Sequence, residues 1–152
     1  MATGTEQALL PLTPDEEALL RSLRQVMFAL PRALDTDLVR EQRITLAEYT
    51  TLMHLSEAPR NMLRMSELAA ANDVSLSGMT RLVTRLEERG LVKRTKCAED
   101  ARGWNAALTD AGLTRLREAW PTHLASVRRH IFTHLEGFDL ARLATALSTF
   151  AT

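Results

Sequence analysis

The strongest constraint on the fold is the order of four short segments in the middle of the chain, two helical and two strand-like. They span residues 65–71, 75–90, 91–96 and 104–108. Asn72 and Asp73 stop the first helical segment, and Ser75 is a good N-cap for the second, which ends at Gly90. The last two segments have the length and composition of hairpin strands. Helix, tight turn, helix and hairpin in this order predict a winged helix-turn-helix within a mainly α fold.

The second of these helices has two faces of different chemistry. Its apolar side chains recur at helical spacing and are expected to pack on the core: Met79, Leu82, Val83 and Leu86. The opposite face carries hydroxyls and arginines without a carboxylate: Ser77, Thr80, Arg81, Thr84 and Arg85. Arginine pairs with guanine in the major groove, and Ser or Thr reaches phosphates or base edges. We therefore predict that this face contacts DNA, with Ser75 beside a phosphate; the alternative is an ordinary solvated helix face.

The charge of the chain is balanced overall and uneven along its length. With 19 basic and 19 acidic residues the formal net charge is zero, which argues against a generic binder of polyanions. Residues 60–104 nevertheless hold nine basic and six acidic residues. This modest surplus lies where the predicted helix and hairpin would meet DNA.

Amphipathic helices flank the central segments on both sides. Capping boxes begin the two N-terminal helices at Thr13 and Thr45, and Pro31 is expected to kink or split the first of them. On the C-terminal side, Thr109 begins a long helix that should bend at Pro121 and end at Gly137. A final helix over residues 138–151 follows, with its leucines and Phe150 facing inward.

The apolar stripes of the flanking helices are larger than a winged-helix core can cover. We therefore expect them to meet a second copy of the chain and to form a dimerisation region. The predicted organisation is a flexible tail over residues 1–12, the dimerisation region over 13–44 and 110–152, and the DNA-binding region over 45–109.

Four stretches of the sequence strongly resemble the MarR (multiple antibiotic resistance regulator) family. They are residues 64–69 (RMSELA), 75–92 (SLSGMTRLVTRLEERGLV), 100–103 (DARG) and 108–112 (LTDAG). The resemblance implies a triangular dimer with interlocked terminal helices, two recognition helices in successive major grooves and a wing arginine in each flanking minor groove. It also implies an Asp-x-Arg wing motif in which Asp100 orients or braces Arg102. The chain departs from the family pattern in residues 96–99 and Trp104, and Lys96 joins the predicted DNA contacts.

Two features could serve a sensor, and a plainer interpretation is favoured for each. Cys97, the sole cysteine, lies at the wing, whereas thiol-switched members of the family resembled place theirs elsewhere, so we interpret it as structural or incidental. His123, His130 and His134 share one face of the long C-terminal helix. His130 and His134 could share a zinc ion, but no cysteine is near in sequence, so a solvated or interface face is favoured. We predict no metal and no cofactor.

A small-molecule site is a further expectation that the resemblance brings. Candidates to line it, between the dimerisation and DNA-binding regions, are Phe28, Tyr49, Met53, His54 and Trp120. Core packing explains these side chains equally well, with His54 the exception.

The remaining function classes receive little support. The sequence contains no nucleophile–base pair, phosphate loop or metal cluster of known spacing, so we predict that the protein is not an enzyme. It shows no signal peptide and no apolar run long enough for a membrane span, and we expect it in the cytoplasm. The hypothesis is a homodimeric transcriptional regulator, a repressor, that binds an inverted repeat in double-stranded DNA and is released by a small molecule. The alternatives are a DNA-binding protein without ligand control and a redox- or metal-responsive regulator.

Overall fold

The computed structural model describes residues 10–98, 100 and 102–151, so most of the predicted tail lies outside the described residues. The elements in chain order are α1 (Pro14–Gln42), α2 (Leu46–Glu57), β1 (Met62–Arg64), α3 (Met65–Ala71), α4 (Leu76–Glu88), β2 (Val92–Lys96), β3 (Trp104–Leu108), α5 (Asp110–His130) and α6 (Leu140–Ser148). Short 3₁₀ turns lie at Pro59–Asn61, Phe132–Leu135 and Thr149–Ala151. The mainly helical fold with a small antiparallel sheet confirms the predicted winged helix.

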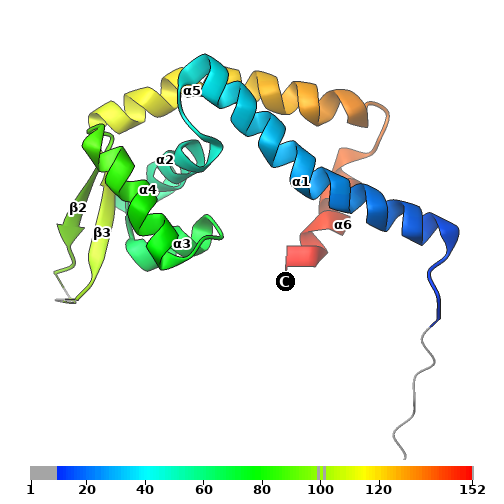
Figure 1. Ribbon diagram of the computed structural model, residues 1–152, viewed down its shortest axis with the longest axis horizontal. Helices are drawn as coiled ribbons and strands as arrows, with labels where there is room; N and C mark the ends of the chain where they lie inside the picture. The colour runs from blue at the N-terminus through cyan, green and yellow to red at the C-terminus, as the bar shows by residue number, and fades with distance from the viewer. Residues whose placement is uncertain (1–9, 99, 101, 152) are drawn as a thin grey trace, which may run out of the picture.

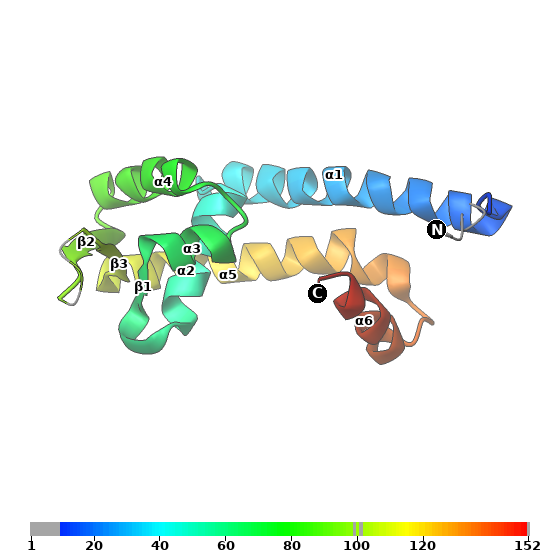
Figure 2. The same ribbon diagram turned by 90° about the horizontal axis from the view of Figure 1, so that it is seen from below.

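The molecule has two ends joined by two long helices (Figures 1 and 2). α1 and α5 run side by side along its length. The helices α2, α3 and α4 gather with the sheet at one end, and α6 folds back at the other. None of the helices in residues 10–98 and 102–151 combines the length and apolarity that crossing a membrane requires.

Each of the two long helices contains a proline inside it and continues past it. The capping box at Thr13 is confirmed, but Pro31 lies within an unbroken α1 and does not split it. Pro121 likewise lies inside α5. That helix ends at His130, well before the predicted Gly137, because the backbone of Ile131 leaves helical geometry (φ −121°, ψ −69°) and the chain continues as the 3₁₀ turn Phe132–Leu135.

The sheet contains a strand that the sequence analysis missed. β3 is central, with β2 on one side and the three-residue β1 on the other. β1 pairs with β3 through Met62 opposite Ala107 and Arg64 opposite Asn105. Its short length hides it in the sequence, because its stability depends on a partner more than forty residues away.

The core lies at the sheet end and is closed within the chain. Leu38 of α1, Leu52 of α2, Leu68 of α3 and Leu86 of α4 are fully buried in one cluster. The first turn of α5 packs directly against the backbone at Leu91. A Cβ atom on Gly112 would lie only 2.1 Å from the Leu91 carbonyl oxygen. Only glycine allows α5 to begin against the end of α4 in this way.

The other end has no comparable core. No described side chain of α6 is buried, and Leu140, Leu147 and Phe150 are exposed, so the expected inward packing does not occur within one chain. The N-terminal half of α1 also exposes large apolar side chains: Leu19, Leu20, Val26, Met27 and Phe28.

A buried carboxylate ties α1 to α5 between the two ends. Asp37 accepts hydrogen bonds from Ser126 (2.6 Å), Arg129 (3.1 Å) and His130 (2.9 Å). The Ser126 hydrogen bond is the main cause that holds the pKa of Asp37 below its ordinary value, and the other partners outweigh the opposing effect of burial. His130 is therefore part of an interhelical clamp and not of a solvated face.

Candidate nucleic-acid interface

Helix α4 is held rigidly by its apolar face and its two ends. The Ser75 hydroxyl accepts a hydrogen bond from the Gly78 amide (3.1 Å), which confirms the predicted N-cap. The predicted apolar residues of α4, Met79, Leu82, Val83 and Leu86, are all buried. Gly90 has a φ of 70°, and the Leu91 amide donates to the Leu86 carbonyl (2.9 Å), so the chain turns tightly from the helix into the wing.

The outer face of α4 carries the predicted hydroxyls and arginines into solvent. Ser77, Thr80, Arg81 and Arg85 are exposed and Thr84 is half-buried. The Thr80 and Thr84 hydroxyls donate to helix carbonyls one turn earlier, which leaves their lone pairs open to outside donors. Arg81 has no hydrogen bond or ion pair with any residue that the structure describes, so its guanidinium is available for a ligand.

Arg85 differs from Arg81 because it has a partner within the chain. Its Nε atom lies 3.8 Å from a carboxylate oxygen of Glu48, and Arg89 approaches the other oxygen at 3.4 Å. Glu48 is buried and also accepts the Thr45 amide in the capping box of α2, as predicted. The two arginines therefore balance a buried carboxylate, a role that the sequence analysis did not assign to Arg85.

The wing is the hairpin of β2 and β3. The Asp100 carboxylate accepts the backbone amide of Arg102 (3.0 Å) and lies 3.9 Å from the Arg64 guanidinium. Asp100 thus braces the backbone that carries Arg102 and does not hold the arginine side chain itself. The Lys96 ammonium lies 5.7 Å from the centre of the Trp104 ring, and the two residues are paired across β2 and β3 on one face of the hairpin.

A further ion pair sets the position of the wing against α4. The backbone amide and Nε of Arg94 donate to the two carboxylate oxygens of Glu87 (3.1 and 2.9 Å). This two-point contact joins β2 to the last turn of α4. Sequence analysis missed the pair, because no local pattern indicates that residues on a helix and a strand will meet.

A hollow of about 350 Å³ lies between α4 and the wing. Thr80 of α4 and Asp100 and Arg102 of the wing line it, so the structure brings these three predicted residues together.

The sensor candidates are separated by the structure. Cys97 donates its thiol hydrogen to the Asn105 side-chain oxygen (2.9 Å). His123 stacks on Tyr49, with ring centres 4.4 Å apart, while His134 is exposed. Within the described part of the chain, no three His, Cys, Asp or Glu side chains are grouped so that they could hold a metal ion.

The ligand-site candidates are only partly brought together. Tyr49 is buried, which together with the charge of Glu57 raises its pKa to about 12. Trp120 lies beside the same histidine, at 6.2 Å between ring centres. Burial lowers the pKa of His123, and its Nδ1 atom is buried without a hydrogen-bond partner among the residues that the structure describes. Met53 packs against the core and His54 is half-buried, whereas Phe28 is exposed and lines a separate hollow on α1.

Comparisons with known proteins agree on one family. The sequence model of the MarR family matches residues 44–103. The chain is similar to the structure of AbsC, a MarR family transcriptional regulator from Streptomyces coelicolor, with 38% identity, 94% and 96% of the two chains covered and a TM-score of 0.84. The structure of Sco3205 from the same organism, in complex with DNA, gives 34% identity, 94% and 90% coverage and a TM-score of 0.86. A transcriptional repressor of Bacillus subtilis, MdtR, is 28% identical over 115 residues, which is 74% of this chain and 73% of that protein.

Proposed function

The chain belongs to the MarR family of transcriptional regulators, and on this basis we propose that it acts as a homodimeric repressor on an inverted-repeat operator. The observation that carries the proposal is the outer face of α4, which exposes hydroxyls and Arg81, an arginine without a partner among the described residues. Figure 1 shows α4 next to the wing strands β2 and β3. Sco3205, similar along most of its length, has been solved with DNA, and MdtR is a repressor.

In this proposal α4 enters the major groove and the wing reaches the adjacent minor groove. Arg81 reads a base edge, and Ser75, Ser77 and the free amides at the start of α4 hold phosphates. Arg102 and Lys96 respond to groove width and to the negative potential of the backbone. A two-fold dimer then requires half-sites about one helical turn, roughly 10 base pairs, apart.

The dimer is proposed because one end of the chain leaves apolar helix faces uncovered. α1 exposes Leu20 and Phe28, and α6 exposes Leu147 and Phe150. Soluble chains rarely leave such contiguous faces in water. A second copy, related by a two-fold axis, covers both faces and sets the spacing of the two α4 helices.

We further propose that a small molecule releases the protein from its operator. The Nδ1 atom of His123 has no hydrogen-bond partner in the described part of the chain. It lies between Tyr49 and Trp120 and offers one buried hydrogen bond in an aromatic environment. This site lies where α2 meets α5, so an occupant would change the position of the DNA-binding end relative to the long helices. A ligand that binds there should raise the melting temperature of the protein, and a protein without ligand control would show no such rise.

The decisive experiment is in vitro selection of bound duplexes followed by titration at several salt concentrations. We expect an inverted repeat, and we expect Arg102→Ala to reduce the salt slope by about 0.9 for each phosphate that the arginine neutralises. The exposed Arg117 of α5 supplies the control variant Arg117→Ala, which should leave the slope unchanged. Selection of a single asymmetric site, or an unchanged slope in Arg102→Ala, would contradict the proposal.

A further inference from the structure

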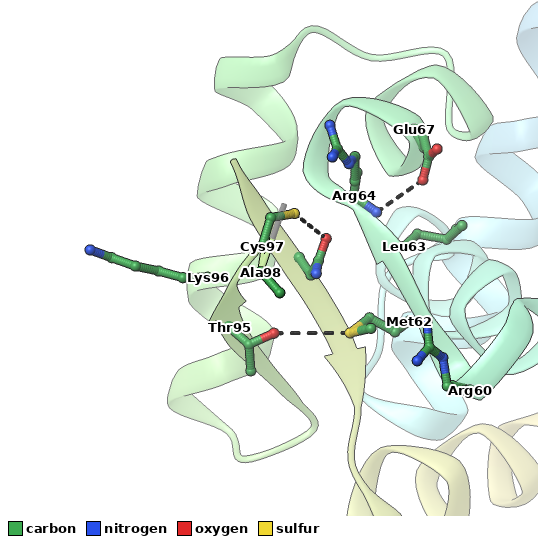
Figure 3. A pocket seen from close by; sticks show the side chains of 10 residues that line it. Arg60, Met62, Leu63, Arg64, Glu67, Thr95, Lys96, Cys97 and Ala98 are labelled. Carbon is green, nitrogen blue, oxygen red and sulfur yellow. Dashed lines mark hydrogen bonds between the residues drawn. The ribbon is translucent and has the colours of Figure 1, made fainter. Parts of the chain in front are cut away.

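Trp104 is an exposed aromatic residue on the inner face of the wing sheet, the face that packs on the core. It lies directly opposite Lys96 in the pairing of β2 and β3, and it is 46% exposed. Side chains alternate along a strand, so Trp104 shares its face with Ala106, which belongs to the core cluster. The outer face carries Thr95 beside a separate hollow, and the Lys96 side chain extends away from that hollow (Figure 3). Trp104 and Lys96 therefore lie together on the inner face, at its solvent-exposed end.

The Trp104 ring borders the hollow of about 350 Å³ between α4 and the wing. Thr80 of α4 and Arg102 of the wing line the same hollow. The indole N–H of Trp104 makes no hydrogen bond with any residue that the structure describes, so one donor is available beside the ring. The Lys96 ammonium lies 5.7 Å from the ring centre and adds a positive charge. The hollow thus has at its edge a flat apolar surface, an open hydrogen-bond donor and a cation.

The proposed docking of α4 and the wing puts one strand of the DNA backbone over this hollow. The major groove and the adjacent minor groove of a duplex are separated by a single sugar–phosphate strand. Thr80 belongs to the helix that enters one groove, and Arg102 belongs to the wing that reaches the other. The strand between the two grooves must therefore cross the hollow that both residues line. This step rests on the proposed function.

We propose that Trp104 contacts DNA directly, with its ring packed against a deoxyribose of this strand. Its indole N–H donates to a phosphate next to that sugar, and Lys96 balances the phosphate charge. The C–H groups of the sugar cover the exposed part of the ring and remove apolar surface from water. Contacts to sugar and phosphate position a protein on a duplex and carry no sequence information. Trp104 therefore adds affinity for any duplex, whereas Arg81 reads sequence.

Affinity measurements with Trp104 variants test this role. Fluorescence anisotropy follows the binding of a labelled operator, obtained by in vitro selection, and of a scrambled duplex of equal length at several salt concentrations. We expect Trp104→Ala to weaken binding of both duplexes by the same factor, about 5- to 30-fold per half-site. The salt slope should not change, because the uncharged ring releases no counterions. Trp104→Phe keeps a flat ring and should lose less affinity, and Thr95→Ala, on the outer face of the sheet, should match the wild type.

Fluorine NMR of the full protein labelled with fluorotryptophan detects the contact without a substitution at Trp104. The chain has two tryptophans, so the resonance that is missing from the Trp104→Phe protein belongs to Trp104. Addition of the operator should move this resonance. It should also reduce the difference in its chemical shift between H₂O and D₂O, because DNA covers the part of the ring that is exposed in the free protein.

The outcomes separate the Trp104 contact from the proposed function. Operator binding that leaves the Trp104 resonance and its solvent dependence unchanged would overturn the contact and retain DNA binding. A loss of affinity for the operator alone would also overturn it, because a backbone contact serves both duplexes. If Trp104→Ala lowers the salt slope as much as Lys96→Ala does, the ring acts only by orienting the lysine, and the direct contact is wrong. A wild-type protein that binds neither duplex would overturn the proposed function and this inference together.

Discussion

The two ends of this molecule begin from the same kind of sequence pattern and reach opposite degrees of burial. At the sheet end, the apolar stripe of α4 is buried, and Leu86 is fully shielded from solvent. At the other end, the stripes of α1 and α6 remain open, with Leu20 54% and Leu147 45% exposed. The helical spacing of apolar residues indicates that one face of the helix must be buried. Whether the surface that buries this face belongs to the same chain or to a second copy depends on contacts between distant residues, which local sequence patterns do not reveal.

Because the two ends differ in burial, we expect substitutions at each end to change a different property of the protein. At the closed end, an apolar side chain stabilises the fold of each chain. At the open end, the same kind of side chain contributes little to one chain, and its effect should appear in association. Substitutions at matched helical positions can therefore test the comparison.

The largest effect is expected for Leu147→Glu in α6. Burial of a leucine contributes about 1.5–3 kcal/mol, so loss of two copies should weaken the dimer by about 3–6 kcal/mol. Sedimentation equilibrium should then give a mass near 17.0 kDa at concentrations where the wild type is twice that mass, and operator affinity should fall with it. Thr145→Glu introduces the same charge on the opposite face of α6 and should remain dimeric. A Leu147→Glu protein that stays dimeric would show that α6 is not part of the interface.

Leu86→Ala in α4 tests the closed end. Removal of a fully buried leucine leaves a cavity and should lower the free energy of unfolding by about 2–5 kcal/mol. Urea unfolding at one protein concentration measures this decrease, and Leu76→Ala, at an exposed position of the same helix, is the matched control. Equal decreases in the two variants would contradict the closed core.

Asp37→Asn tests the clamp between the two ends. Charged hydrogen bonds contribute about 1.5–3 kcal/mol. The neutral Asn side chain cannot accept hydrogen bonds from both Ser126 and Arg129 as the carboxylate oxygen does, so the free energy of unfolding should fall by about 1.5–3 kcal/mol near neutral pH. The folded state holds the pKa of Asp37 below 3.8, so its carboxylate adds stability above that pH and loses the contribution as the pH falls through the lowered value. Asp37→Asn should thus lose more stability at pH 7 than at pH 3, while the exposed Glu41→Gln should lose little at either.

The features that sequence predicted well depend on neighbours within one turn or one hairpin. The N-caps at Thr13, Thr45 and Ser75, the buried face of α4 and the strand 104–108 are confirmed as predicted. Each depends on residue types three or four positions apart in a helix, or on a short strand-forming run next to a loop. Fold class followed from their order.

The features that sequence did not predict join distant segments. Asp37 lies 89 positions from Ser126, and β1 exists because β3 pairs with it. The early end of α5 is a local exception, because the backbone of Ile131 leaves helical geometry where no glycine or proline marks a helix end. In the candidate DNA interface, the residues of α4 follow from its periodicity, but the contacts of Arg85 with Glu48 and of Arg94 with Glu87 require the folded chain.

The smallest expected effect separates two arginines of the same helix face. Arg81 is unpartnered among the described residues, whereas Arg85 lies 3.8 Å from the buried Glu48. Arg81→Ala should therefore cost about 1–3 kcal/mol per half-site and relax preference at one base position, because the variant cannot form a bidentate contact to guanine. Arg85→Ala should reduce operator affinity less and should lower the free energy of unfolding by about 0.2–1 kcal/mol, as an exposed partner of an ion pair does. Titration of the operator and of duplexes substituted at single positions, beside urea unfolding of both variants, measures these effects. If Arg85→Ala relaxes base preference and Arg81→Ala does not, Arg85 leaves Glu48 on binding and becomes the residue that reads sequence.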